Sequence, residues 1–243
     1  MEQPQRCSNT SGTLLQRANS LESLLLRLTY RPGEEYHPLP HEDDTEPALL
    51  LDVLSSLLRS LADKDLELYQ HSLRVHALVA YLVANLDLPP QTAAAIELAG
   101  LFHDIGKLSL PCELLHKNAP LSTQEFQEIQ KHCYRGTWLL LQHRQLKLAA
   151  LSVFHHHERW NGRGYPCGLQ GLSIPLGARL ISIADAYDVM THPRAYHPCP
   201  HTCSEALEEL AQCAGTQFDP NLVTHFCLLA PSMEQTLRLH IVV

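Results

Sequence analysis

Residues 45–64 read TEPALLLDVLSSLLRSLADK, and this stretch decides the fold class. Thr45 is of the residue type that caps helix N-termini, and Pro47 falls in the first turn, where proline is tolerated. The leucines after Pro47 recur at helical spacing, and they are Leu50, Leu51, Leu54, Leu57, Leu58 and Leu61. The stretch therefore predicts an amphipathic α-helix that packs its leucine face against a core.

Helical patterns continue from there toward the C-terminus. Apolar periodicity predicts helices over residues 66–87, 90–103, 122–142, 147–157, 175–191, 204–214 and 219–229. Capping boxes begin two of them, at Ser122 with Glu125 and at Thr202 with Glu205, and Gly215 is predicted to end a helix. Strand alternation between hairpin turns is not found in the sequence, so we predict an all-α fold.

The N-terminal part of the chain has a different composition. Residues 1–46 are polar and proline-containing, and we predict a flexible or loosely docked arm in which only residues 20–28 form a short helix. The helical patterns predict one domain over residues 47–230, followed by a tail over residues 231–243.

Composition excludes several classes of function. The chain carries 18 basic and 26 acidic residues, and a net charge of −8 argues against broad binding to DNA or RNA. No apolar stretch approaches the roughly 18 residues of a membrane span, and the N-terminus does not show a secretory signal. The eight cysteines are scattered without a CxxC pair, so we expect reduced thiols in a cytoplasmic protein.

Histidines and carboxylates gather at helical positions. Glu67 and His71 lie four residues apart and so share a helix face, while His103 and Asp104 fall near a helix end. Asp185 stands in an apolar run, where a carboxylate is costly unless it is paired or bound to a cation. The full set of metal-type residues is Glu67, His71, His103, Asp104, His132, His156, His157 and Asp185.

Simpler interpretations apply to other histidines. Isolated ones are more often surface or hydrogen-bonded core residues than ligands, and these are His76, His116, His143, His225 and His240. Residues 197–203 alternate histidine and cysteine, but two prolines make a loop the better interpretation than a zinc site. For the set of eight, binding to shared metal ions is a better explanation than eight unrelated surface or core residues. Imidazole and carboxylate ligands without thiolates suit Fe, Mn, Zn or Ni.

Several motifs in order carry a resemblance to a known family. They include His103-Asp104-Ile105-Gly106-Lys107, a run from His156 to Pro166 that contains Gly164-Tyr165-Pro166, and Phe218-Asp219-Pro220. Over residues 60–230 the chain resembles the HD-GYP domain, the branch of the HD superfamily of metal phosphohydrolases that cleaves cyclic di-GMP. The resemblance implies an HD-domain helical bundle with the C-terminal helical extension typical of HD-GYP domains.

The resemblance also implies roles for particular residues. The set of eight would bind two or three divalent ions, Fe or Mn, with Glu67 associated with the three-metal form. Asp104 and Lys107 would be catalytic, because a carboxylate can bridge two metals that share a hydroxide, and an ammonium can neutralise phosphoryl charge. Residues that would contact the substrate are Lys107, Tyr165, Asp188 and Arg194.

Departures from the family pattern keep alternatives open. Asn161 and Cys167 differ from the usual residues but are not ligand positions, whereas His197 stands where a basic residue is common. The expected activity is hydrolysis of cyclic di-GMP to pGpG or GMP. The alternatives are a module that binds cyclic di-GMP with little cleavage, and a phosphohydrolase of another cyclic dinucleotide. Protein partners in second-messenger signalling and a homodimer are further expectations.

Overall fold

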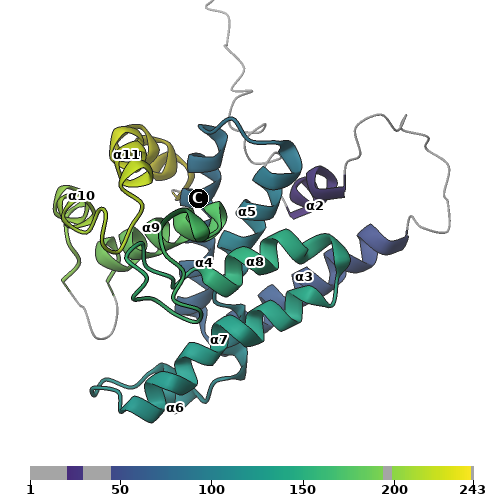
Figure 1. The fold of residues 1–243 in the computed structure, drawn as a ribbon. Coiled ribbons are helices and arrows are strands. Elements are labelled where there is room, and N and C mark those ends of the chain that lie inside the picture. The colour runs from purple at the N-terminus through teal and green to yellow at the C-terminus, as the bar shows by residue number, and fades with distance from the viewer. Residues whose placement is uncertain (1–20, 30–44, 194–198, 242–243) are drawn as a thin grey trace, which may run out of the picture.

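The computed structural model describes residues 21–29, 45–193 and 199–241, and it is built from helices (Figure 1). The longer helices are α2 (Leu21–Thr29), α3 (Thr45–Lys64), α4 (Leu66–Ala84), α5 (Pro90–Phe102), α7 (Thr123–Leu141), α8 (Lys147–His155), α9 (Leu176–Thr191), α10 (Cys203–Gln212) and α11 (Pro220–Ile241). The short ones are η2 (Ile105–Ser109), α6 (Cys112–Leu115), η3 (Arg144–Leu146) and η4 (Gly171–Ser173). Extended pairing in the described residues is limited to isolated bridges, so the all-α prediction is confirmed.

Helix α5 is the centre of the bundle, packed against α4 on one side and α8 on another. Every residue from Ala94 to Phe102 is buried, which explains why this helix reads as apolar all round. Small side chains let the neighbouring helix come close, since a Cβ at Gly100 would lie 3.2 Å from Val79. Helix α5 therefore delivers His103 and Asp104, which follow it directly, to the middle of the protein.

A second close approach fixes the position of η2. A Cβ at Gly106 would lie only 2.0 Å from the carbonyl oxygen of His132, so η2 meets α7 backbone to backbone. Lys64, at the end of α3, donates hydrogen bonds to the carbonyls of Leu108 and Leu110 and holds the other end of η2. These contacts bring Asp104 beside His132, although the two residues lie far apart in the sequence.

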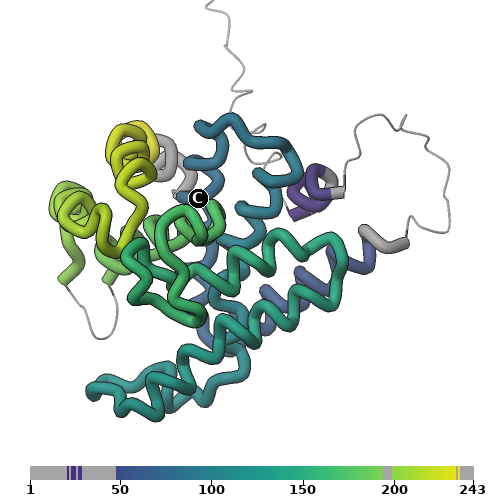
Figure 2. Tube along the Cα trace, in the orientation of Figure 1, coloured from purple at the N-terminus to yellow at the C-terminus, as the bar shows by residue number. Residues whose placement is uncertain are grey.

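Both predicted capping boxes are confirmed. Ser122 with Glu125 begins α7, and Thr202 with Glu205 begins α10, each with the reciprocal side-chain and backbone bonds. Gly215 has φ of 77°, the left-handed conformation expected of a residue that ends a helix. Figure 2 shows α10 and α11 together on one side of the bundle, next to α9, as the expected C-terminal extension.

The short helix predicted at residues 20–28 is present as α2, but its docking and the end of the last helix differ from the expectations. Helix α2, inside the predicted arm, packs on α5 with Leu24 and Leu25 buried. Arg27 donates two hydrogen bonds, of 2.9 and 2.7 Å, to the buried carboxylate of Glu97. At the other end, α11 continues through Pro231 to Ile241 where a tail was predicted, and Met233 is buried. Burial against α5 therefore orders α2 within a polar stretch of sequence. Burial of Met233 likewise continues α11 past Pro231. Residues 1–20, 30–44 and 242–243 lie outside the described residues.

Within the described residues, none of the helices combines the length and apolar character needed to cross a membrane.

Candidate metal centre and cavity

Asp104 lies at the centre of a group of histidines. Its Oδ2 is 3.4 Å from His103 Nε2 and 3.8 Å from His71 Nε2, while its Oδ1 is 3.4 Å from His132 Nε2. The two carboxylate oxygens therefore face different histidines. His156 and His157 also belong to the group. Their ring centroids lie 5.3 and 5.1 Å, respectively, from the ring centroid of His132.

Backbone carbonyls orient three of these rings. The Nδ1–H of His103, His132 and His156 donates to a carbonyl three residues earlier, at 2.9, 2.6 and 2.6 Å. Each bond is made within or next to the helix that carries the histidine, so the helix itself selects the tautomer. The lone pair on Nε2 then points into the group, which is the arrangement that metal-binding histidines need.

A buried carboxylate orients His71 instead. His71 Nδ1 donates to Asp188 Oδ2 at 2.7 Å, and Arg74 supports Asp188 with bonds of 2.7 and 3.0 Å. The other ring nitrogen, Nε2, lies 3.1 Å from Asp185 Oδ1. Asp185 and His71 thus face each other from helices α9 and α4, across the same space that Asp104 borders.

Burial and charge set the protonation of the group. Burial lowers the pKa of His132 to about 3 and that of His157 to about 4, and it holds the pKa of His156 well below its usual value. These rings are therefore neutral at pH 7, the form in which imidazole binds metals. Burial disfavours an ionised Asp104, but Lys107 and His103 outweigh it and hold the pKa of the carboxyl well below its ordinary value.

The donor atoms fit divalent cations. His103 Nε2 and Asp104 Oδ1 are buried without a hydrogen-bond partner, which is costly in a low-dielectric interior. The Nε2 atoms of His132 and His156 face each other at 3.4 Å, although both rings donate through Nδ1. Two sets of donors lie close enough to share one ion each: His71, His103 and Asp185, and His132, Cys133, His156 and His157. Asp104 stands between the two sets.

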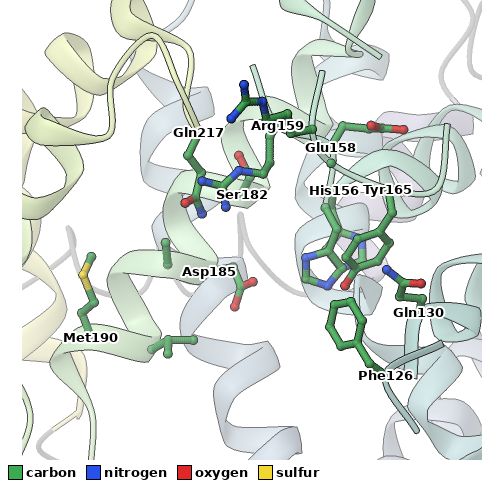
Figure 3. A pocket seen from close by; sticks show the side chains of 15 residues that line it. Phe126, Gln130, His156, Glu158, Arg159, Tyr165, Ser182, Asp185, Met190 and Gln217 are labelled. Carbon is green, nitrogen blue, oxygen red and sulfur yellow. The ribbon is translucent and has the colours of Figure 1, made fainter. Parts of the chain in front are cut away.

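A cavity of about 550 Å³ opens onto this centre (Figure 3). Asp185 lies on one side of it, while His156 and Tyr165 lie together on the other. Tyr165 is stacked on His157 with ring centroids 4.8 Å apart, and the Phe126 ring meets Tyr165 edge to face. Aromatic faces and the metal-type donors therefore share one space, whose size suits a small-molecule ligand.

The loop that carries Tyr165 is held by backbone contacts. A Cβ at Gly164 would lie 2.3 Å from the amide nitrogen of Arg159, so only glycine fits there. The amides of Trp160 and Asn161 donate to the carbonyls of Gln217 and Thr216 at 2.9 Å each, which ties the loop to the segment before α11. The side chains of Arg159 and Arg163 also line the cavity and bring cations to it.

Comparison with known proteins gives the family. A family model described as HD domain matches residues 55–222, which include all the residues of the metal centre. The chain belongs to the HD domain family. Its motifs are those of the HD-GYP branch, as the sequence predicted.

Relatives of this HD domain agree with that placement. The cyclic di-GMP phosphodiesterase PA4108 of Pseudomonas aeruginosa is 38% identical over 71% of the chain, and the 3'3'-cGAMP-specific phosphodiesterase 1 of Vibrio cholerae is 36% identical over 66%. The chain covers 41% and 38% of their lengths. The solved structure of Bd1817, an HDG"Y"P protein of Bdellovibrio bacteriovorus, shares the fold with a TM-score of 0.54 at 17% identity, over 90% of this chain and 78% of that one.

Some predicted residues lie elsewhere in the HD domain than the sequence suggested. Glu67 is exposed one turn before His71 and is not among the clustered donors. Asp188 is fully buried behind His71 and does not line the cavity, which argues against direct contact with a substrate. Lys107 donates to Asp104 Oδ2 at 2.6 Å and so faces the metal centre. Arg194 and His197 lie outside the described residues.

The sequence interpretation also missed three residues. Cys133 is buried within 3.6 Å of His132 Nε2, and burial raises the pKa of its thiol. The predicted set contained only histidines and carboxylates, and a residue that directly follows His132 on a helix projects from a different face, so the sequence carried no signal for Cys133. Arg159 and Arg163 stand inside the quoted run before Tyr165, where two cations within five residues could have indicated an anion.

Proposed function

We propose that this HD domain hydrolyses cyclic di-GMP with two or three divalent ions, Fe or Mn. The observation that carries the proposal is the position of Asp104, whose two oxygens face separate sets of donors beside the cavity. The name of the Pseudomonas aeruginosa relative supports the substrate. When bound, such ions supply Lewis acidity and a nucleophile at neutral pH.

Residues of the chain account for the other requirements of the reaction. His71, His103, His132, His156, His157 and Asp185 would hold the ions, with Asp104 between the two sets. Lys107 would neutralise charge on a phosphate held near Asp104, since its ammonium already lies at that carboxylate. We also propose that Glu67 supplies an additional metal ligand and that Arg194 contacts a phosphate.

The walls of the cavity suit a nucleotide. Tyr165 and Phe126 present rings on which a guanine base can stack, and stacking of a base on an aromatic side chain contributes about 1–3 kcal/mol. Arg159 and Arg163 can meet phosphate oxygens. Seven cysteines of the described residues are free thiols, which supports the proposed cytoplasmic location. A homodimer and protein partners in signalling stay predictions.

A substrate panel tests the proposal. The chain, loaded anaerobically with Fe²⁺ or Mn²⁺, is incubated with cyclic di-GMP, 3'3'-cGAMP and linear pGpG, and products are separated by chromatography. We expect cyclic di-GMP to be consumed fastest, and Asp104→Ala to lower kcat by at least about 100-fold. Asp52→Ala, on the exposed face of α3, is the matched control and should keep full activity.

Other outcomes favour other functions. Faster turnover of 3'3'-cGAMP would assign the chain the substrate in the name of its Vibrio cholerae relative. Binding of cyclic di-GMP in calorimetry without turnover, at full metal content, would mean a binding module. If the metal-loaded chain neither binds nor cleaves any of the dinucleotides, the proposed function is wrong.

A further inference from the structure

A second group of metal-type donors lies beneath the Tyr165 loop. His155, Glu158 and Cys167 each offer one ligand atom, and the three atoms lie within 4.8 Å of one another. None of the three belongs to the donor sets around Asp104. Glu158 also borders the cavity, and Figure 3 shows its carboxylate turned away from Asp185.

His155 has an unsatisfied nitrogen aimed at the group. It is the last residue of α8, and only 8% of its surface is exposed. Its Nδ1 is buried without a hydrogen-bond partner and lies 3.5 Å from Glu158 Oε1. A buried imidazole nitrogen left unpaired is costly, so a partner at this point would stabilise the structure.

Glu158 is a buried carboxylate that needs a cation. Its Oε1 accepts the amide of Cys167 at 2.7 Å, and its Oε2 accepts the amide of Leu169 at 3.0 Å. Each oxygen keeps a lone pair after these bonds. Among the described residues, none of the lysine or arginine nitrogens lies within 4.0 Å of it. A buried negative charge without a cation is unfavourable.

Cys167 completes the group from the loop. Its thiol is exposed, while its backbone amide is fixed on Glu158, so the side chain stays near the carboxylate. We propose that His155, Glu158 and Cys167 bind a zinc ion, with solvent at the fourth position. Imidazole, carboxylate and thiolate are ligands that zinc accepts in tetrahedral sites. The thiolate favours zinc over manganese at this position.

Zinc at this position would fasten the loop that forms one wall of the cavity. It would join the last residue of α8, directly before His156 and His157, to Cys167, two residues after Tyr165. The expected role is to position Tyr165, not to take part in hydrolysis. We therefore expect zinc to lower KM for the dinucleotide in the wild-type chain without changing kcat.

Alkylation of the full chain tests the site without relying on activity. Metal is removed with a chelator, zinc is added in excess, and iodoacetamide labelling of each cysteine is followed by mass spectrometry. We expect zinc to slow labelling of Cys167 by at least about tenfold, because a coordinated thiolate is a poor nucleophile. Cys112 and Cys199, which are also exposed, should label at the same rate with and without zinc.

Elemental analysis supplies the second half of the test. Wild type should hold one more zinc ion per chain than Cys167→Ser, and Cys112→Ser should match wild type. Equal zinc contents in wild type and Cys167→Ser, or unchanged labelling of Cys167, would each overturn the inference. Both results are independent of dinucleotide turnover, so they can fail while the proposed hydrolysis stands, and the reverse also holds.

Discussion

The metal centre and the Tyr165 loop border the same cavity but are built in different ways. Around Asp104, histidines are fixed by their own helices, because His103, His132 and His156 each bond a carbonyl three residues earlier. The loop depends on partners distant in the sequence, such as Thr216 and Gln217. From this difference we predict that the helices set the proposed reaction, whereas the loop sets which ligand is held.

The largest expected effect on turnover comes from the contact that joins the helices. Gly106→Ala places a methyl group against the backbone of His132, which should cost about 3 kcal/mol or more of unfolding free energy and abolish metal binding and turnover. Denaturant unfolding and metal content measure both losses. Gly100→Ala is the control, since the three atoms nearest to its Cβ belong to the Val79 side chain, at 3.2 to 3.4 Å, and not to backbone. Equal stability of the two variants would show that the η2–α7 contact does not hold the centre together.

Asp188→Asn tests whether the metal centre depends on the hydrogen bond between Asp188 and His71. Loss of the charged acceptor on His71 Nδ1 should weaken metal affinity and turnover by about 10- to 100-fold while the chain stays folded. Metal titration measures the affinity, and circular dichroism shows whether the variant is folded. Asp52→Asn, at an exposed position, should bind metal as wild type does. Unchanged affinity in Asp188→Asn would mean that Asp188 only packs against Arg74.

A smaller effect should separate the loop from the centre. Tyr165→Ala removes the ring that lines the cavity, so we expect KM for cyclic di-GMP to rise by about tenfold while the metal content stays the same. Tyr165→Phe keeps the ring and should restore most of the affinity. A loss of metal in Tyr165→Ala would contradict the division of roles between loop and helices.

The smallest effect on turnover is expected at α2, which packs on α5 and α3. Leu24→Ala empties a fully buried position and should lower the unfolding free energy by about 2–5 kcal/mol. Turnover per folded molecule should change by less than about twofold, because the side chains of α2 that the structure describes are not among those of the metal centre or the cavity. Leu49→Ala, at a site that is 61% exposed, is the control for stability. A large loss of turnover in folded Leu24→Ala would show that α2 acts on the site.

Local patterns were enough to predict much of the molecule. Leucine spacing and capping boxes predicted the helices. Ligand-type side chains on apolar helices, among them His71, His103 and Asp185, were predicted to share a partner, and the fold brings these three together. The rings of His103, His132 and His156 are oriented by carbonyls three residues earlier, so this part of the geometry is local to each helix. The assignment of these residues as ligands stays a prediction.

Features that depend on distant contacts were not predictable. The burial of α2 depends on Glu97 and α5, so its polar surroundings suggested a loose arm. The position of Asp188 behind His71 depends on Arg74, which lies 114 residues earlier. Cys133 gains its place among the donors only when α7 packs on α8, because His156 and His157 follow from the end of α8. The spacing of residues along one helix does not predict these contacts between distant segments of the chain.

The most direct test of the central claim joins metal content to turnover. Mn²⁺ is titrated into the metal-free wild-type chain, and bound ions per chain and the initial rate of cyclic di-GMP hydrolysis are measured on the same samples. We predict that the rate rises as the second ion per chain binds, because Asp104 lies between two sets of donors. Hydrolysis at full rate in the metal-free chain, or none with both ions bound, would contradict the account.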